Sequence, residues 1–297
     1  MDEVAVRQML EYVDESVIYH SQDTEHMKNF LGFLSKLRSS ASVANKILIY
    51  GYEPNATDVR TAEDWNMLGV RVLHQERVIH NVKRLEGKKR GYEDRILYDI
   101  TATDGVGKPF MQYGDVGLFT ERVLLYPPCP IRFLENAASG KGKAEYNQEE
   151  QVIEVTNGFS SELEVSHLVL RESAHHFLRE KLETDTKRYN RRAHAIDAFS
   201  VAYAICLRFG VQPPKLDNIQ PAGGLKASDL LEIFSALDYA IEKVSDQIER
   251  GPDLKRIAEN RRRMEQRLGS EKKKEDARKE EPKVDLGEPP KLPEMGR

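Results

Sequence analysis

The spacing of apolar residues divides the chain into a helical start, a strand-like stretch and a second, mostly helical part. Apolar positions recur every three or four residues in four early segments, which predicts helices at about 4–20, 25–38, 43–52 and 61–68. Residues 70–100 then alternate between apolar and polar, as antiparallel strands do. We therefore expect residues 1–120 to form a small domain of helices and an antiparallel sheet.

A proline-rich stretch, Tyr126–Pro130, continues neither a helix nor a strand and marks a boundary. After it, the pattern predicts a hairpin at about 145–155 and helices at about 161–183, 187–209 and 227–249. Residues 130–250 are thus predicted to form a second domain, mostly helical with a small sheet, so the fold class is α+β. We expect a basic helix at 251–268 and a disordered, charged tail at 269–297, where Lys, Glu and Pro dominate.

Composition restricts where the protein acts. The net charge is −4 and the sequence pI is about 6.1, so a nucleic-acid site has to be local rather than a global basic field. Two distant cysteines suggest no disulfide framework, and no apolar run has the length of a membrane helix. The start, Met1-Asp2-Glu3, lacks the layout of a signal peptide. We expect a cytoplasmic protein without a membrane partner.

Candidate chemistry concentrates in the segment Arg171-Glu172-Ser173-Ala174-His175-His176, on the predicted helix 161–183. It differs by one residue from His-Glu-x-x-His, in which two histidines on one helix face bind zinc and the glutamate acts on the bound water. Arg171 stands at the first histidine position. Because a guanidinium stays protonated and has no lone pair to donate, this position cannot bind a metal.

Two metal-ligand candidates are left, His175 and Asp197, and Glu172 is a catalytic candidate only if the site is active. We favour a site in which Arg171 forms an ion pair with Glu172 or Asp197 in place of the metal. We therefore expect no cofactor and no enzymatic activity. The alternative is a remodelled zinc site that recruits further histidines, namely His176 or His194.

A basic stretch between residues 71 and 90 is the candidate nucleic-acid site. On a hairpin, alternate residues share a face and could follow a phosphate backbone, with nearby aromatic rings stacking on unpaired bases. The alternative is a solvated edge strand protected from aggregation by its charges, with the aromatic residues in the core. The candidate contacts are Lys46, Tyr50, Arg71, Arg77, Lys83, Arg84, Lys88, Lys89 and Arg90.

Several motifs resemble a known family. Pro54-Asn55-Ala56-Thr57 and Thr61-Ala62-Glu63-Asp64-Trp65-Asn66-Met67-Leu68-Gly69 resemble the single-stranded-DNA-binding domain of the ArdC antirestriction family, over residues of about 25–105. Arg171-Glu172-x-x-His175 and the segment that starts at Asp197-Ala198 resemble the metallopeptidase-like half of such proteins and of the ImmA/IrrE group. That family usually has Glu at the position of Asp197.

This resemblance implies a function. It points to a sequence-nonspecific, single-stranded-DNA-binding accessory protein of a mobile genetic element, acting in conjugation, as LtrC-like proteins do, or in antirestriction. Its zincin-like domain would be an inactive metallopeptidase, and its partners would be single-stranded DNA and conjugation or restriction-system proteins. Two alternatives stay open: a zinc metallopeptidase with a remodelled site, and an antirestriction adaptor that binds protein.

Overall fold

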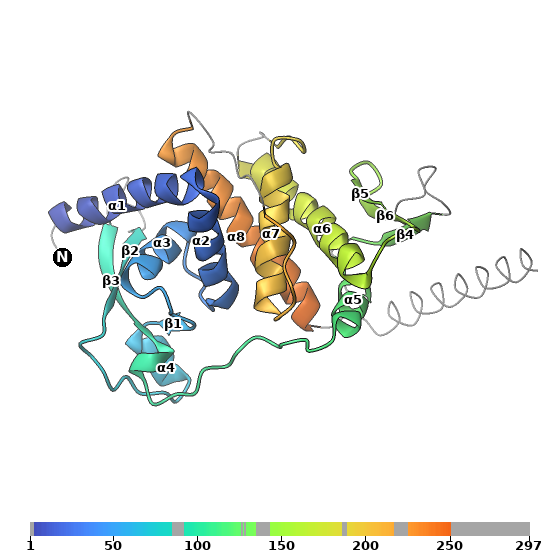
Figure 1. Ribbon diagram of the computed structural model, residues 1–297. Helices are drawn as coiled ribbons and strands as arrows, with labels where there is room; N and C mark the ends of the chain where they lie inside the picture. The colour runs from blue at the N-terminus through green and yellow to red at the C-terminus, as the bar shows by residue number, and fades with distance from the viewer. Residues whose placement is uncertain are drawn as a thin grey trace, which may run out of the picture. The chain divides into compact units, whose positions relative to one another are not determined.

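The computed structural model describes residues 3–84, 92–125, 127, 129–134, 143–185, 189–216 and 225–250. Within these residues the chain is α+β, with two small sheets and a larger helical part (Figure 1). No helix in this part of the chain is long and apolar enough to cross a membrane. The predicted basic helix at 251–268 and the charged tail at 269–297 lie outside the described residues.

Three helices open the chain: α1 (Glu3–Gln22), α2 (Thr24–Lys36) and α3 (Val43–Tyr52). Helix α2 begins at Asp23, whose carboxylate accepts hydrogen bonds from the backbone N–H groups of Glu25 (2.7 Å) and His26 (3.2 Å). Its apolar stripe is fully buried, as the spacing predicts.

The first sheet has the strand order β1-β3-β2 and is antiparallel: β1 is Val59–Arg60, β2 is Ile79–Arg84 and β3 is Tyr92–Asp99. The short helices α4 (Ala62–Met67) and η1 (Ile100–Ala102) flank it. Trp65 is buried and its indole N–H donates to the carbonyl of Tyr98 at 2.9 Å, so it belongs to the core. The alternation at Val72 produces no strand but an isolated bridge to Thr103.

The second part begins with α5 (Val116–Leu125), followed by a sheet of order β4-β6-β5. Strand β4 (Ile131–Leu134) is parallel to β6 (Val152–Thr156), and β5 (Ala144–Asn147) is antiparallel to it. Three long helices complete it: α6 (Glu162–Asp185), α7 (Ala195–Arg208) and α8 (Ala227–Arg250).

Helix α7 begins later than its apolar pattern predicts. The side chain of Asn190 accepts hydrogen bonds from the backbone N–H groups of Arg192 (3.0 Å) and Ala193 (3.1 Å). This turn competes with helical hydrogen bonding, so the helix starts only after His194. The turn places Tyr189, Arg191 and His194 beside helix α6, where the metal motif lies.

Helices from both sides of the predicted boundary share one core. Helix α2 packs on α7, and α8 packs on α1 and α3, while α6, α7 and α8 pack on one another (Figure 1). One face of α8 and the first sheet therefore line the same groove.

Candidate functional site

Glu172, the general base of an intact motif, is enclosed by donors on both carboxylate oxygens. Arg171 donates to Oε1 from Nε at 2.8 Å, and the backbone N–H of Tyr146 donates to Oε2 at 2.8 Å. Arg191 also donates to Oε2. The Glu172 side chain is 0% exposed. Both carboxylate oxygens of Glu172 are therefore engaged, by two guanidinium groups and one backbone N–H.

The remaining predicted ligands are each engaged with a different partner. His175 Nδ1 lies 2.8 Å from the hydroxyl of Tyr189, and His194 Nδ1 lies 2.7 Å from Asp197 Oδ2. Burial lowers the pKa of His175 to about 3, with the charges of Arg191 and Arg171 acting in the same direction. His175 is therefore a neutral, buried side chain. His176, a candidate for a remodelled site, bonds the hydroxyl of Tyr146 at 3.0 Å.

These residues do not fit a zinc ion. Zinc needs three or four convergent donors, whereas Arg171 and Arg191 bring two fixed positive charges to the same place. Across the described ranges no group of three or more His, Cys, Asp or Glu side chains is arranged to hold a metal. Arg171 forms its pair with Glu172 rather than Asp197, and its guanidinium also lies 5.1 Å from the Phe199 ring.

The lowered pKa of His175 predicts acid sensitivity. His175 stays neutral in the folded protein but takes up a proton on unfolding below its ordinary pKa of 6.5. Its contribution to the free energy of unfolding is therefore complete above pH 6.5 and is lost as the pH falls toward about 3. Over this range the free energy of unfolding changes by up to about 1.4 kcal/mol per pH unit. Urea denaturation between about pH 7 and 4 should show a flatter pH dependence for His175→Gln than for the unmodified protein.

His74 is exposed and serves as the control, because His74→Gln should leave that pH dependence unchanged. Burial lowers the pKa of His20 to about 4, so His20 adds a pH dependence of the same sign to the free energy of unfolding of every variant. An unchanged slope in His175→Gln would show that His175 does not carry the effect.

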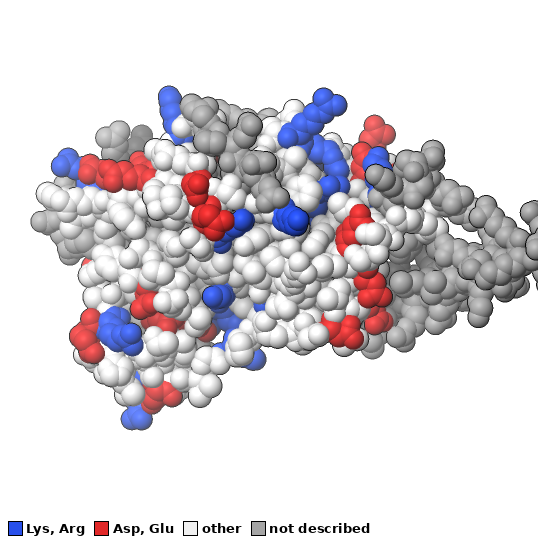
Figure 2. Space-filling view, viewed as in Figure 1, with Lys and Arg blue, Asp and Glu red and all other residues white. Residues whose placement is uncertain are grey.

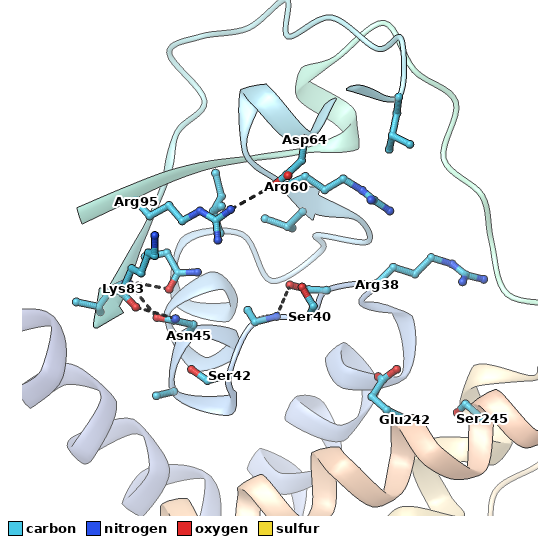
Figure 3. A pocket seen from close by; sticks show the side chains of 18 of the residues that line it. Arg38, Ser40, Ser42, Asn45, Arg60, Asp64, Lys83, Arg95, Glu242 and Ser245 are labelled. Atoms are coloured by element: carbon cyan, nitrogen blue, oxygen red, sulfur yellow. Dashed lines mark hydrogen bonds and ion pairs between the residues drawn. The ribbon is translucent and has the colours of Figure 1, made fainter. Parts of the chain in front are cut away.

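A groove with a volume of about 1050 Å³ lies in the N-terminal part (Figure 3). Its walls come from segments far apart in sequence: the α2–α3 loop, the start of α3, the first sheet with α4, and α8. On the face shown in Figure 2, positive and negative side chains are interspersed. A binding site for a charged ligand therefore depends on local arrangement inside the groove.

Each strand of the first sheet contributes one cation to the groove: Arg60 from β1, Lys83 from β2 and Arg95 from β3. The register pairs Asn81 with Arg95, and Lys83 lies two residues beyond Asn81, so these three side chains share the face that lines the groove. Asn45 bonds both backbone groups of Val82, at 2.9 and 3.1 Å, which fixes this edge strand against α3.

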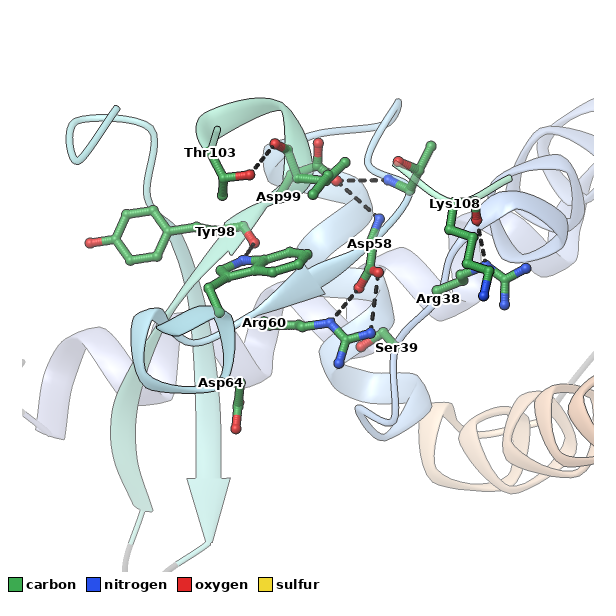
Figure 4. A network of polar contacts seen from close by, with 12 residues as sticks. Arg38, Ser39, Asp58, Arg60, Asp64, Tyr98, Asp99, Thr103 and Lys108 are labelled. Carbon is green, nitrogen blue, oxygen red and sulfur yellow. Dashed lines mark hydrogen bonds and ion pairs between the residues drawn. The ribbon is translucent and has the colours of Figure 1, made fainter. Parts of the chain in front are cut away.

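The arginines of this wall are held by carboxylates of the same sheet region, Arg60 as in Figure 4 and Arg95 as in Figure 3. Asp58 binds Arg60 through two hydrogen bonds of 2.9 and 3.2 Å, and Asp64 binds Arg95 at 3.3 Å. Asp99 in turn accepts from the backbone N–H of Asp58 at 3.2 Å. Arg60 and Arg95 are 38% and 46% exposed, so part of each guanidinium is open to a phosphate while Asp58 and Asp64 stay in place.

The structure places the sequence-predicted contacts in different surroundings. Lys83 lines the groove, whereas Lys46, also expected to contact nucleic acid, is 2% exposed and binds Asp238 at 2.7 Å. Its position in the middle of α3, facing α8, explains this. Tyr50 is partly buried among the rings of the α1–α3 core.

The other predicted contacts lie apart from the groove or cannot be placed. Arg71 is exposed and pairs with Asp104 at 2.9 Å, and Arg77 is exposed in the same loop. The backbone of Arg84 ends β2, while Lys88, Lys89 and Arg90 lie outside the described residues. Sequence reasoning missed Arg60 and Arg95, because neither belongs to a basic run: Arg60 lies between Val59 and Thr61, and Arg95 follows Glu93 and Asp94.

No protein-family model matches this sequence, and no curated protein matches it. Two solved structures are similar, the metal-free and the Mn(II)-bound crystal structures of the antirestriction protein ArdC from the R388 plasmid. Each has a TM-score of 0.40 and 13% identity over 84% of this chain, covering 98% and 97% of the ArdC chain respectively. A similarity this distant does not by itself establish a shared function.

Proposed function

We propose that this protein binds single-stranded DNA in the groove between the first sheet, the start of α3 and α8. One observation carries the proposal: Arg60, Lys83 and Arg95, one from each strand, line the same groove of about 1050 Å³. Cations in a row along a sheet can follow a phosphate backbone, and they provide most of the affinity of proteins for nucleic acids.

The two walls of the groove differ in charge, which favours a single strand over a duplex. The sheet wall carries the three cations with Asp64, whereas the α8 wall carries Glu242, Asp246 and Glu249, two of which pair with Arg208 and Arg38. A single strand can turn its phosphates to one wall and its unpaired bases to the other. A duplex presents phosphates on both outer edges, so one of them would face the carboxylates.

Polar side chains between the walls can bond unpaired bases. They come from the α2–α3 loop and the first turn of α3, and they are Ser39, Ser40, Ser42 and Asn45 (Figure 3). Hydroxyl and amide groups donate and accept hydrogen bonds, so they suit base edges of any sequence. This arrangement supports binding without strong sequence preference along most of the strand.

We infer that the α6–α7 region supports this role as a scaffold and does not hydrolyse peptides. The support is the enclosed carboxylate of Glu172, which two arginines and a backbone N–H hold. With the resemblance of the sequence motifs to ArdC-type proteins, we propose an accessory role in conjugation or antirestriction, with restriction or conjugation proteins as further partners.

The test is fluorescence anisotropy with labelled oligonucleotides of about 20 nucleotides, single-stranded and duplex, across a salt series. We expect the single strand to bind more tightly. The double variant Arg60→Gln/Arg95→Gln should weaken binding by about tenfold or more, and the loss of two phosphate contacts should reduce the salt slope by about 1.4.

The matched control is Arg7→Gln/Arg132→Gln, which changes net charge equally at two exposed ion-paired arginines outside the groove. If the groove variant and the control variant bind the single strand with equal affinity, the groove is not the DNA-binding site. Failure of the unmodified protein to bind single strands at low salt would contradict the proposed function itself.

A further inference from the structure

One face of α8 forms the deep side of the groove, with two arginines anchored along it. Glu242, Ser245 and Glu249 follow one another at spacings of three and four residues, so they share this face (Figure 3). Arg208 Nη2 donates to Glu242 at 2.8 Å, and Arg38 Nη2 donates to Glu249 at 3.4 Å. The two anchor points are about 10 Å apart along the helix, with Ser245 between them.

Phe110, in the segment between η1 and α5, lies against both guanidinium groups. Its ring centroid is 3.6 Å from the guanidinium carbon of Arg38 and 4.4 Å from that of Arg208. Aromatic rings and arginine planes are the surfaces on which unpaired bases stack in nucleic-acid complexes. The ring is 9% exposed, so the deep end of the groove offers these planes for stacking, beside a polar helix face, once the ring shifts.

Two buried polar atoms at this end have no hydrogen-bond partner within the described chain: Arg208 Nη1 and Ser245 Oγ. The two residues are 2% and 1% exposed, and both line the groove. The other Arg208 nitrogens are occupied, with Nε bonding the Ser35 carbonyl at 3.1 Å and Nη2 the Leu34 carbonyl at 2.8 Å. A buried polar atom without a partner is costly, so it points to a ligand or a bound water.

We propose that the deep end of the groove is a nucleobase site that selects guanine. Arg208 and Arg38 offset the charges of Glu242 and Glu249, and Asp246 adds one more carboxylate, so the balance of charge there favours an uncharged ligand with both acceptors and donors. Guanine offers O6 and N7, the atoms that arginine binds most often, and its N1–H and N2 amino groups donate to carboxylates. Ser245 Oγ can donate to the same edge.

Arg208 Nη1 is sealed from solvent beneath its neighbours, so a base reaches it after the Phe110 ring shifts. Phe110 lies in a segment without helix or strand, which makes such a shift local. The site rests on the proposed function in one respect: the bound strand delivers the base. A free guanine nucleoside has the same chemistry and is the other possible source.

The test compares labelled single strands of dT with one central residue replaced by dG, deoxyinosine or 7-deaza-dG, in anisotropy titrations at fixed salt. One dG should tighten binding about tenfold over dT alone. Deoxyinosine lacks the N2 amino group and 7-deaza-dG lacks N7, so each should lose most of this gain. Because only the ligand changes, no outcome depends on a variant that fails to fold.

Ser245→Ala supplies the protein-side test. It removes an unpartnered hydroxyl, so we expect unchanged stability and a smaller ratio of dG affinity to dT affinity than in the unmodified protein. Equilibrium dialysis with guanosine is the second arm. Binding of dT strands without any gain from dG overturns the guanine site and leaves the proposed function intact. If guanosine binds but no strand does, the proposed function is overturned and the guanine site stands. If neither ligand binds, both proposals are overturned.

Discussion

Glu172→Gln is expected to lower the free energy of unfolding by about 3 kcal/mol. The side chain of Glu172 is 0% exposed and is the shared partner of Arg171 and Arg191. Glutamine keeps the shape but removes the charge, so two largely buried guanidinium groups lose their counter-ion. Breaking such a pair costs more than the pair contributes, because the remaining charges stay desolvated.

Urea denaturation at about pH 7 measures this, with Glu150→Gln as the matched control. Glu150 pairs with Arg132 on the surface, and its substitution should leave stability unchanged within error. In a working zinc peptidase the same change at the general base removes activity and leaves the fold intact. A fully stable Glu172→Gln variant, together with one zinc bound per unmodified chain, would therefore show that this is a functioning metal site.

The helices near the N-terminus were the most predictable part of the fold. In α2 the apolar spacing, the capping Asp23 and the buried stripe agree, so local sequence and tertiary packing require the same structure. Strand β4 was not predicted. It pairs in parallel with β6, joining Ile131 to Ile153, although β5 lies between the two strands in the sequence. Four residues contain too little periodicity to reveal a partner that distant.

An ion pair of Arg171 with Glu172 or Asp197 was a prediction from chemistry, since an arginine at a ligand position needs an anion, and the structure has the pair with Glu172. The second guanidinium was not foreseen. Arg191 lies in a segment predicted as helix, and the Asn190 turn brings it back to Glu172. Such a contact depends on where a helix begins, which is the least certain part of a sequence-based prediction.

The groove could not be predicted from the sequence. Arg60 and Arg95 are separated by 35 positions and meet through strand pairing, while the facing wall comes from α8 near the other end of the chain. Counting basic residues along the sequence selected the basic stretch at 71–90 instead, of which Lys83 lines the groove. A cation's use depends on its burial and its partner, and neither is visible in a linear count, as Lys46 demonstrates.

Lys46→Met is expected to destabilise the protein by about 3–5 kcal/mol. The ammonium group lies 2.7 Å from Asp238 on α8, with Glu242 at 3.9 Å. Burial raises the pKa of Asp238, and Lys46 opposes that rise. Without the lysine the Asp238 carboxylate keeps its desolvation cost and loses the charge that offsets it.

Urea denaturation at about pH 7 checks the loss, and Lys143→Met is the control, because that lysine is exposed beside Glu145. The double variant Lys46→Met/Asp238→Leu should recover most of the stability, since an apolar pair leaves no buried charge. Folded Lys46→Met should still bind single-stranded DNA, because Lys46 itself does not line the groove.

The pH dependence separates charge from packing in this result. A carboxyl whose folded pKa is raised favours the folded state while protonated, and that contribution is lost as pH rises through the folded pKa. Lysine removal raises the pKa of Asp238 further, so the stability difference between Lys46→Met and the unmodified protein should shrink as pH falls from about 7 toward 4. A difference that stays constant over this range would mean that the lysine stem contributes through packing and the ion pair contributes nothing.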